Sequence, residues 1–209
     1  MVHYKLTYFD VRGLGEVSRQ LFHLANVEFD DVRVPRNGKE WDGMKDGTPF
    51  GQLPVLEVDG VEIPQSMAIG RYLARKFGYA GRTAEEEAWC DAIVDLFKVF
   101  ILSLKKFTLA RRRGDSAEQL KHIRETIVNP ARDVYFKNLN KLLEKSKSGY
   151  LVGDGLTWAD LVVADNLTTL ANLKFYDREV EKKLGEYQER INSTDGLKQW
   201  LEKRPVTVQ

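Results

Sequence analysis

The N-terminal part of the chain alternates apolar and polar positions and then changes to a helical spacing. Residues 4–9, Tyr-Lys-Leu-Thr-Tyr-Phe, alternate in part and are rich in aromatics, which predicts a strand. Apolar residues then recur every three or four positions, as at Leu21 and Leu24, which predicts a helix over about 16–25. A second short strand is expected at 29–34. The three elements form a unit of the right length for a right-handed parallel crossover.

A β-hairpin follows this unit. Residues 35–52 are irregular, with at most a short helix near 39–45, and strands are then predicted at 55–58 and 61–63. Asp59-Gly60 lies between these strands and supplies the positive φ angles that a type I′ turn needs. Two antiparallel strands should therefore join the sheet.

The pattern changes after the next helix. Ser66 is expected as the N-cap of this helix, and Gly78 ends it, since glycine adopts the left-handed conformation at least cost. From Thr83 onward the chain shows long helical periods and no strand signal. We therefore expect an α/β, thioredoxin-like domain over residues 1–79 and an all-helical domain over residues 80–209.

The helical domain should begin with a long helix from about Ala84 to Leu109. Its apolar positions step by three or four residues: Trp89, Ile93, Leu96, Phe100, Leu104 and Phe107. Residues 111–114, Arg-Arg-Arg-Gly, suit a helix end because cations stabilise a helix C-terminus and glycine caps it. A phosphate-binding patch is the alternative interpretation of this arginine run.

Capping motifs mark two later helices. Ser116 and Gln119 form a capping box for a helix with a buried side at Leu120, Ile123, Ile127, Val134 and Leu142, and Pro130 should kink it. Thr157 and Asp160 form a second capping box, so Asp160 is expected to serve folding rather than catalysis. Further helices are predicted from about Glu179 and Thr194.

Composition limits the classes of partner. The 209 residues carry 32 Lys and Arg against 31 Asp and Glu, a net charge of +1, so no global field attracts nucleic acid or an anionic membrane. The longest apolar stretches have about four residues, far short of the roughly 20 that span a bilayer. Lys5 and Asp10 interrupt any signal-peptide core. We expect a cytoplasmic protein with a small-molecule partner.

The chain has little thiol or metal chemistry of its own. Cys90 is the only cysteine, so neither an internal disulfide nor a Cys-x-x-Cys redox pair can form. Its place beside Trp89 favours helix packing over a nucleophile. The three histidines have no metal-ligand spacing, and no metal is expected. Any thiol chemistry must therefore use a thiol from the substrate.

Three local features converge at one edge of the predicted sheet. Tyr8 ends the first strand, Pro54 precedes the third, and Gln65-Ser66 begins the following helix. Each has an ordinary structural explanation as a core residue, a strand starter or a helix cap. Together they suggest a cleft for an extended peptide, in which a cis Pro54 exposes the backbone of Leu53 and the helix N-terminus binds a carboxylate.

These residues resemble the cytosolic glutathione transferases. The resemblance covers nearly the whole chain and is nearest the sigma-like class, which includes many nematode enzymes and the haematopoietic prostaglandin D synthases. It is carried by residues 4–9, by Pro-Phe-Gly-Gln-Leu-Pro-Val-Leu at 49–56, by Gln-Ser at 65–66 and by Thr-Trp-Ala-Asp at 157–160. The resemblance implies a homodimeric enzyme that conjugates glutathione, its co-substrate, to hydrophobic electrophiles, with organic-hydroperoxide reduction as a further activity.

The same resemblance assigns the glutathione site. Tyr8 would donate a hydrogen bond to the sulfur and so stabilise the thiolate. The glycyl end would be bound by Trp41 and Lys45, the cysteinyl part by Gly51, Gln52 and Leu53 beside a cis Pro54, and the γ-glutamyl end by Gln65 and Ser66. Phe9, Leu14 and the Phe107 region are candidates for the electrophile pocket between the domains, although such residues are equally expected in an interdomain core.

The sequence also departs from the sigma-like pattern. Val99 stands where many members carry an Asp that reaches the partner subunit's glutathione, and Leu14 stands where some carry Arg. Lys98 replaces an acidic residue linked to metal activation in the prostaglandin synthases, so a metal-assisted prostaglandin isomerase is not favoured. A carrier of haem, bile-pigment-like or lipid ligands remains the alternative function, but Tyr8 and Gln65-Ser66 serve a thiol peptide and favour the enzyme.

Overall fold

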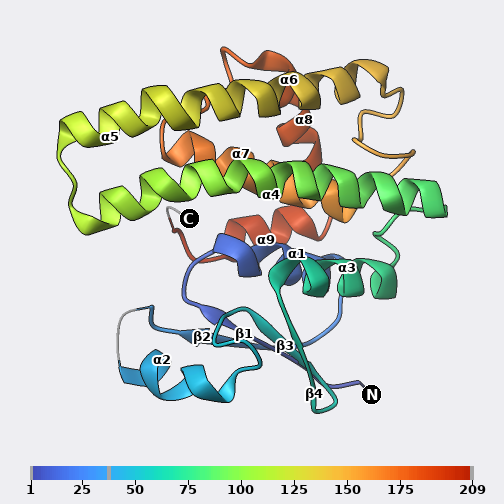
Figure 1. The fold of residues 1–209 in the computed structure, drawn as a ribbon. Coiled ribbons are helices and arrows are strands. Elements are labelled where there is room, and N and C mark those ends of the chain that lie inside the picture. The colour runs from blue at the N-terminus through green and yellow to red at the C-terminus, as the bar shows by residue number, and fades with distance from the viewer. Residues whose placement is uncertain (1, 37–38, 208–209) are drawn as a thin grey trace.

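A four-stranded sheet forms the base of the N-terminal domain. The structure is a computed structural model that describes residues 2–36 and 39–207. The strands lie in the order β2-β1-β3-β4 (Figure 1), with bounds β1 Tyr4–Phe9, β2 Asp30–Val34, β3 Val55–Val58 and β4 Val61–Pro64. β1 pairs in parallel with β2 and antiparallel with β3, and β3 and β4 form the predicted hairpin. Asp59 and Gly60 have φ angles of 48° and 86°, as the type I′ turn requires.

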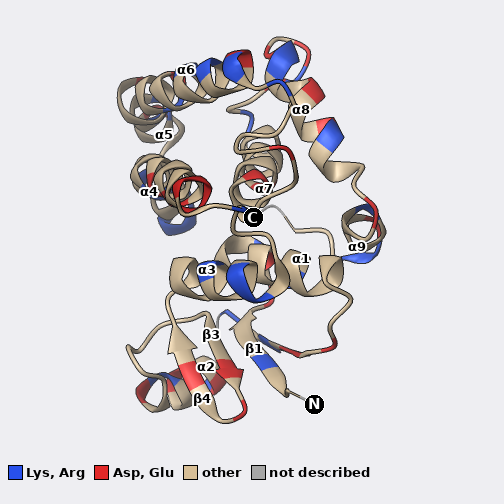
Figure 2. Ribbon diagram, turned by 90° about the vertical axis from the view of Figure 1, so that its right-hand side faces the viewer, with Lys and Arg blue, Asp and Glu red and all other residues tan. Residues whose placement is uncertain are grey.

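Two helices separate the sheet from the helical domain. α1 (Glu16–Leu24) and α3 (Ser66–Phe77) lie between them (Figures 1 and 2), while α2 (Lys39–Met44) lies on the other side of the sheet. Apolar side chains at helical spacing, such as Leu21 and Leu73, are fully buried beneath the sheet residues Leu6 and Leu56. The predicted strand-helix-strand unit is confirmed.

The start of α3 differs from the expectation. Ser66 is the first residue of the helix, and the N-cap position belongs to Gln65, which has a φ angle of 74° and provides no side-chain cap. The helix N-terminus therefore keeps its backbone N–H groups unoccupied by a capping side chain. Gly78 ends α3 in the left-handed conformation, as predicted.

The C-terminal domain contains only helices among the residues described. Their bounds are α4 Ala84–Arg113, α5 Ala117–Ile123, α6 Asn129–Lys145, α7 Trp158–Asn172, α8 Lys182–Asn192 and α9 Leu197–Lys203. α7 is buried over almost its whole length and packs against α1, α4 and α8. Within residues 2–36 and 39–207, no helix has the length and apolar character needed to cross a membrane.

Some details of the long helices differ from the expectation. α4 extends to Arg113 rather than ending at Leu109, while Gly114 caps it with a φ angle of 81°, as predicted. A π-helical segment over Arg124–Val128 precedes Pro130, which sits in the first turn of α6 where its missing N–H costs nothing. Trp89 and Val134, expected on buried faces, are 56% and 59% exposed.

The predicted capping box at the start of α7 is confirmed as a folding device. The carboxylate of Asp160 accepts hydrogen bonds from the backbone N–H of Thr157 at 2.9 Å and from its hydroxyl at 2.8 Å. It also accepts bonds from the N–H of Leu151 at 2.9 Å and the hydroxyl of Tyr187 at 3.0 Å. Asp160 is fully buried by these partners and is remote from solvent.

A buried ionic cluster joins the two domains. Glu16 on α1 accepts hydrogen bonds from Arg204 at 2.6 Å and from the indole N–H of Trp200 at 2.8 Å. Asp165 on α7 accepts bonds from Arg12 at 2.7 Å and from Arg204 at 3.0 Å. The four charged side chains are at most 12% exposed. Arg204, just after α9, therefore connects the C-terminal segment to both α1 and α7.

Candidate functional site

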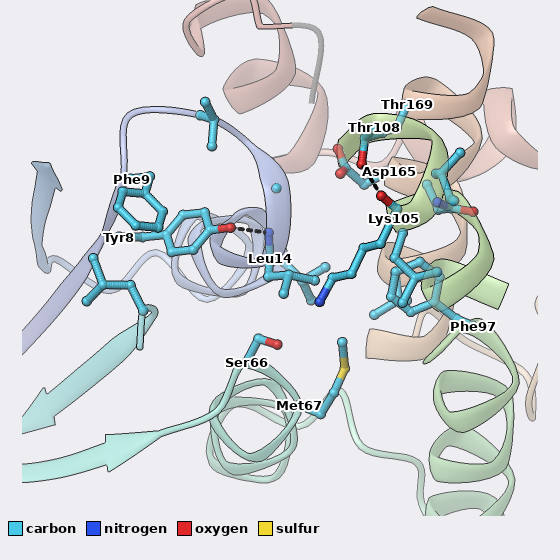
Figure 3. A pocket seen from close by; sticks show the side chains of 18 of the residues that line it. Tyr8, Phe9, Leu14, Ser66, Met67, Phe97, Lys105, Thr108, Asp165 and Thr169 are labelled. Carbon is cyan, nitrogen blue, oxygen red and sulfur yellow. Dashed lines mark hydrogen bonds between the residues drawn. The ribbon is translucent and has the colours of Figure 1, made fainter. Parts of the chain in front are cut away.

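A cavity of about 360 Å³ opens between the two domains (Figure 3). The N-terminal domain contributes Tyr8, Phe9 and Leu14 from β1 and the turn after it, and Ser66 and Met67 from α3. The opposite wall is made by α4 and α7, with apolar side chains Phe97, Ile101, Leu104 and Val162. The cavity thus combines an apolar wall with a tyrosine and a helix N-terminus.

Tyr8 presents its hydroxyl to this cavity. Its ring is only 5% exposed, and the phenolic oxygen accepts a hydrogen bond from the backbone N–H of Leu14 at 3.0 Å (Figure 3). Because the N–H of Leu14 occupies an acceptor position of the oxygen, the phenolic proton can be donated to a ligand. The geometry suits a fixed hydrogen-bond donor.

Tyr8 stays protonated at neutral pH. Burial raises the pKa of the Tyr8 phenol above its ordinary value of 10.0, and this outweighs the lowering by the Leu14 N–H and by the charges of Arg36 and Arg19. A phenol with a raised pKa is a poor base. Tyr8 can therefore donate a hydrogen bond to an anion but is not suited to remove its proton.

Two glycines let the turn after β1 pack directly on Tyr8. A Cβ atom at Gly15 would lie 2.6 Å from the Tyr8 ring carbon Cδ1, and one at Gly13 would lie 2.6 Å from the hydroxyl. Gly13 also has a φ angle of 42°, which favours glycine. In the sequence these glycines mark only a turn, whereas in the structure they fix the orientation of the Tyr8 ring.

The predicted peptide-binding motifs come together on one side of the cavity. The Leu53–Pro54 peptide bond is cis, as expected, and Leu53 lines the cavity together with Ser66. The side-chain amide of Gln65 donates to that of Gln52 at 3.1 Å, which connects the loop before β3 to the start of α3. Residues that are far apart in the sequence therefore form one continuous edge.

Trp41, Lys45 and Gly51 flank the cavity rather than line it. The Trp41 ring packs edge-on against Phe9 with centroids 5.4 Å apart. Lys45 runs beside Gly51, where an added Cβ would lie 3.7 Å from the lysine chain, and Gly51 has a φ angle of 61°. Among the described residues no carboxylate forms an ion pair with Lys45, so its ammonium group is available to an anionic ligand.

Phe107 does not belong to the cavity lining. The expectation that it contributes to the electrophile pocket is corrected by its position on a different face of α4, where it packs edge-on against Phe175 at 4.9 Å. The guanidinium of Arg124 covers both rings. The α4 residues that do face the cavity include Phe97, Ile101 and Leu104, one to three turns earlier in the helix.

The chain's own thiol is not a nucleophile at this site. Cys90 is fully buried in α4, and burial raises the pKa of its thiol to about 11. It does not line the cavity. In the part of the chain that the structure describes, no three His, Cys, Asp or Glu side chains are grouped so that they could hold a metal ion.

The sequence interpretation missed the polar residues of the far wall. Lys105 and Thr108 on α4, and Asp165, Asn166 and Thr169 on α7, also line the cavity. Their signal in the sequence was weak, because polar residues between apolar ones on a long helix normally face solvent. Only the interdomain packing shows that these positions face a ligand site.

Comparisons with known proteins agree over the whole chain. Residues 4–75 match the family model described as the glutathione S-transferase N-terminal domain, and residues 105–204 match that of the glutathione S-transferase C-terminal domain. Glutathione S-transferase 3 of Caenorhabditis elegans is 56% identical over 207 residues, which cover 99% of each chain.

Solved structures show the same similarity. A Nu-class glutathione S-transferase of Haemonchus contortus is 44% identical with a TM-score of 0.90 over 100% of both chains. A glutathione S-transferase of the hookworm Necator americanus, described as monomeric, is 43% identical with a TM-score of 0.90 over 98% of both chains. Prostaglandin synthase D of Nilaparvata lugens is 33% identical with a TM-score of 0.86, covering 98% of this chain and 100% of that one.

Proposed function

This chain belongs to the glutathione S-transferase family, and we propose that Tyr8 is the residue that activates the glutathione thiol. The family assignment gives the reaction, which is transfer of glutathione through its sulfur to an electrophile, with glutathione as co-substrate. One observation carries the role of Tyr8. Its hydroxyl faces the interdomain cavity while the N–H of Leu14 holds the oxygen in place.

The proposed activation has a modest energetic demand. A free thiol has a pKa of about 8.5, and lowering it by about two units makes the thiolate dominant near neutrality, which requires roughly 2.7 kcal/mol. One well-placed donor in a desolvated site, together with the N-terminus of α3, is of that order. Tyr8 supplies the donor because burial keeps the phenol protonated.

The remaining site residues would bind the peptide part of glutathione. The open N-terminus of α3 at Ser66, with Gln65 beside it, suits the γ-glutamyl carboxylate. The backbone of Leu53, before the cis Pro54, can pair with the cysteinyl part, as the neighbouring Gly51 and Gln52 can. Lys45 and Trp41 lie on the side of Gly51 and Phe9 and would bind the glycyl end.

The electrophile would occupy the apolar part of the cavity. Phe9 and Leu14 form its near wall and the apolar side chains of α4 its far wall. This lining suits hydrophobic electrophiles of the kind that detoxification enzymes conjugate, and it equally admits organic hydroperoxides.

Turnover of an aryl halide with glutathione tests the role of Tyr8. We expect Tyr8→Phe to lose most of the rate at neutral pH, with a small change in the affinity for glutathione, because the ring remains and only the donor is removed. An unchanged rate in Tyr8→Phe would remove Tyr8 from the mechanism. Binding of hydrophobic ligands with no turnover by the wild type would favour the carrier function instead.

We also propose that the enzyme is a cytoplasmic, sigma-like homodimer with a domain boundary at residues 78–82. The last strand and helix of the α/β part end before this segment, and α4 begins after it.

Large apolar side chains are exposed on the loop before β3 and on α4 and α6, namely Phe50, Trp89, Val99 and Val134. Exposed apolar side chains of this kind favour the association of two copies of the chain. Sedimentation equilibrium gives the oligomeric state, and a monomer at micromolar concentration would contradict the dimer.

A further inference from the structure

Three cations line the interdomain cavity together with a single acid. The cations are Arg36, Lys105 and Arg112, and the acid is Asp165. The carboxylate of Asp165 is occupied by Arg12 at 2.7 Å and Arg204 at 3.0 Å. Within the described residues, none of the three cations forms an ion pair. The cavity wall therefore has a local positive charge, although the whole chain is nearly neutral.

Lys105 is an exposed residue of α4 that also lines the cavity. It lies two turns before the end of α4, where the helix dipole no longer favours a cation. In Figure 3 its side chain extends from α4 across the cavity toward the side on which Leu14 and Ser66 lie. The ammonium group thus reaches the space that a ligand would fill.

Arg112 differs from the arginines on either side of it. All three of residues 111–113 lie in the last turn of α4, so all three can stabilise its C-terminus. All three are exposed, but Arg113 pairs with Asp115 and Arg111 lies outside the cavity, whereas Arg112 lines it. Lys105 and Arg112 are seven residues apart, about 10 Å along the helix axis, and both face the ligand space.

Arg36 brings a third positive charge to the same region. Its guanidinium lies 5.6 Å from the centre of the Phe9 ring. Burial and the nearby charge of Arg112 lower the pKa of Arg36 below its ordinary value, so the two guanidinium groups repel each other across the cavity. A negatively charged group between them would relieve that repulsion.

We propose that the second substrate of this enzyme is an apolar electrophile with a carboxylate, and that Lys105 and Arg112 hold this carboxylate at the α4 wall. The inference rests on the glutathione transferase function proposed above. Glutathione itself does not require these cations, because Lys45 and the N-terminus of α3 are assigned to its two carboxylates. The apolar side chains Phe97, Ile101 and Leu104 on the same helix would contact the hydrocarbon body.

A matched pair of substrates tests the proposal. Both are nine-carbon α,β-unsaturated aldehydes, one ending in a methyl group and the other in a carboxylate. The thiolate sulfur bonds to the β-carbon of either aldehyde and a solvent proton adds to the α-carbon, so no leaving group is involved. We expect the wild type to favour the carboxylate by about twofold to fivefold in kcat/KM, because Lys105 and Arg112 are exposed and solvent screens their contact with an anion.

Lys105→Met and Arg112→Met should each reduce this preference, and the double variant Lys105→Met with Arg112→Met should abolish it. Lys106→Met and Arg111→Met are the matched controls, since both residues are exposed on the same helix outside the cavity. They should retain the preference. Equal kcat/KM for both aldehydes in the wild type would overturn the proposal while leaving the transferase function intact. An equal loss with both aldehydes in Lys105→Met would also overturn it, because the lysine would then act on the thiolate.

A binding measurement separates this inference from the transferase function. Trp158 lines the cavity, so its fluorescence should report occupancy. Dodecanoate should bind several-fold more tightly than dodecanol to the wild type, and the two ligands should bind equally to the double variant Lys105→Met with Arg112→Met. Equal affinity of the wild type for both ligands would overturn the proposal even if conjugation failed for every electrophile.

Discussion

The backbone N–H of Leu14 donates a 3.0 Å hydrogen bond to the phenolic oxygen of Tyr8. The bond comes from the turn after β1 and fixes the hydroxyl at the edge of the cavity. It also leaves the phenolic proton for the ligand. The side chain of Leu14 takes no part in this bond, although it lines the cavity. The backbone and side chain of one residue thus have separable functions.

This separation predicts different effects in two variants. Tyr8→Phe should raise the apparent pKa of the bound glutathione thiol by about one to two units, because the thiolate loses its hydrogen-bond donor. The rise of kcat/KM with pH should move to higher pH by the same amount. Leu14→Ala keeps the N–H and should leave that pH dependence unchanged, while the KM for an apolar electrophile rises. The measurement is the pH profile of kcat/KM with an aryl halide, and a shifted profile in Leu14→Ala would contradict the assignment.

Gly15→Ala should impair activity through the orientation of Tyr8. Gly15 has no positive φ angle, so the backbone accepts alanine, but the added Cβ would lie 2.6 Å from the Tyr8 ring. The ring must move, and we expect kcat/KM to fall by at least about tenfold, as small displacements in an active site commonly cause. Gly43→Ala is the control, because nothing lies within 4 Å of its added Cβ. Wild-type activity in Gly15→Ala would show that the ring adapts without loss.

The sequence predicted those parts of the fold that depend on local signals. Asp59-Gly60 specified the hairpin, Gly78 and Gly114 the ends of α3 and α4, and Thr157 with Asp160 the start of α7. Each is a backbone requirement met by nearby residues, so it can be recognised without knowledge of the packing. The exposure of Trp89 could not be predicted in this way, because Cys90, Ile93 and Val94 cover the buried face of α4 at that end.

The site was predictable on one side only. The residues of the N-terminal domain, from Tyr8 to Ser66, form motifs that resemble a known family. The far wall depends on how α4 and α7 pack against α1 and α3, and helical periodicity does not show which exposed lysine of α4 lines the cavity, as Lys105 does. The buried cluster of Glu16, Asp165 and Arg204 was missed for the same reason, since its members lie up to 188 residues apart.

Removal of Arg204 should destabilise the protein more than removal of a surface arginine. Glu16 is 1% exposed and would lose the cation that contacts it at 2.6 Å, which leaves a buried carboxylate poorly compensated. Breaking a buried pair costs roughly 3–5 kcal/mol, and for a chain of this size each kcal/mol lowers Tm by about 2–4 °C. We expect Arg204→Met to lower Tm by roughly 6–20 °C in a calorimetric scan.

Arg178→Met provides the comparison. Arg178 pairs with Glu189 at 2.9 Å, but both side chains are more than half exposed, so its loss should cost less than about 1 kcal/mol. Equal losses of Tm in the two variants would mean that the interdomain cluster adds no stability beyond that of a surface pair. A large loss confined to Arg204→Met would confirm that α9 and the segment after it hold the two domains together.

Cys90 should make the stability of the protein depend on pH in the alkaline range. Burial raises the pKa of its thiol from 9.0 to about 11, so the unfolded chain releases this proton at a lower pH than the folded one. The stabilisation is complete below pH 9 and is lost as the pH rises toward 11.

Other groups ionise in this range, so the measured quantity is the difference in unfolding free energy between the wild type and Cys90→Ala. That difference should shrink between pH 9 and pH 11, and Cys90 should resist thiol reagents until the chain unfolds. A constant difference, or rapid modification of the folded protein, would show that the thiol is accessible and contradict its role as a packing residue.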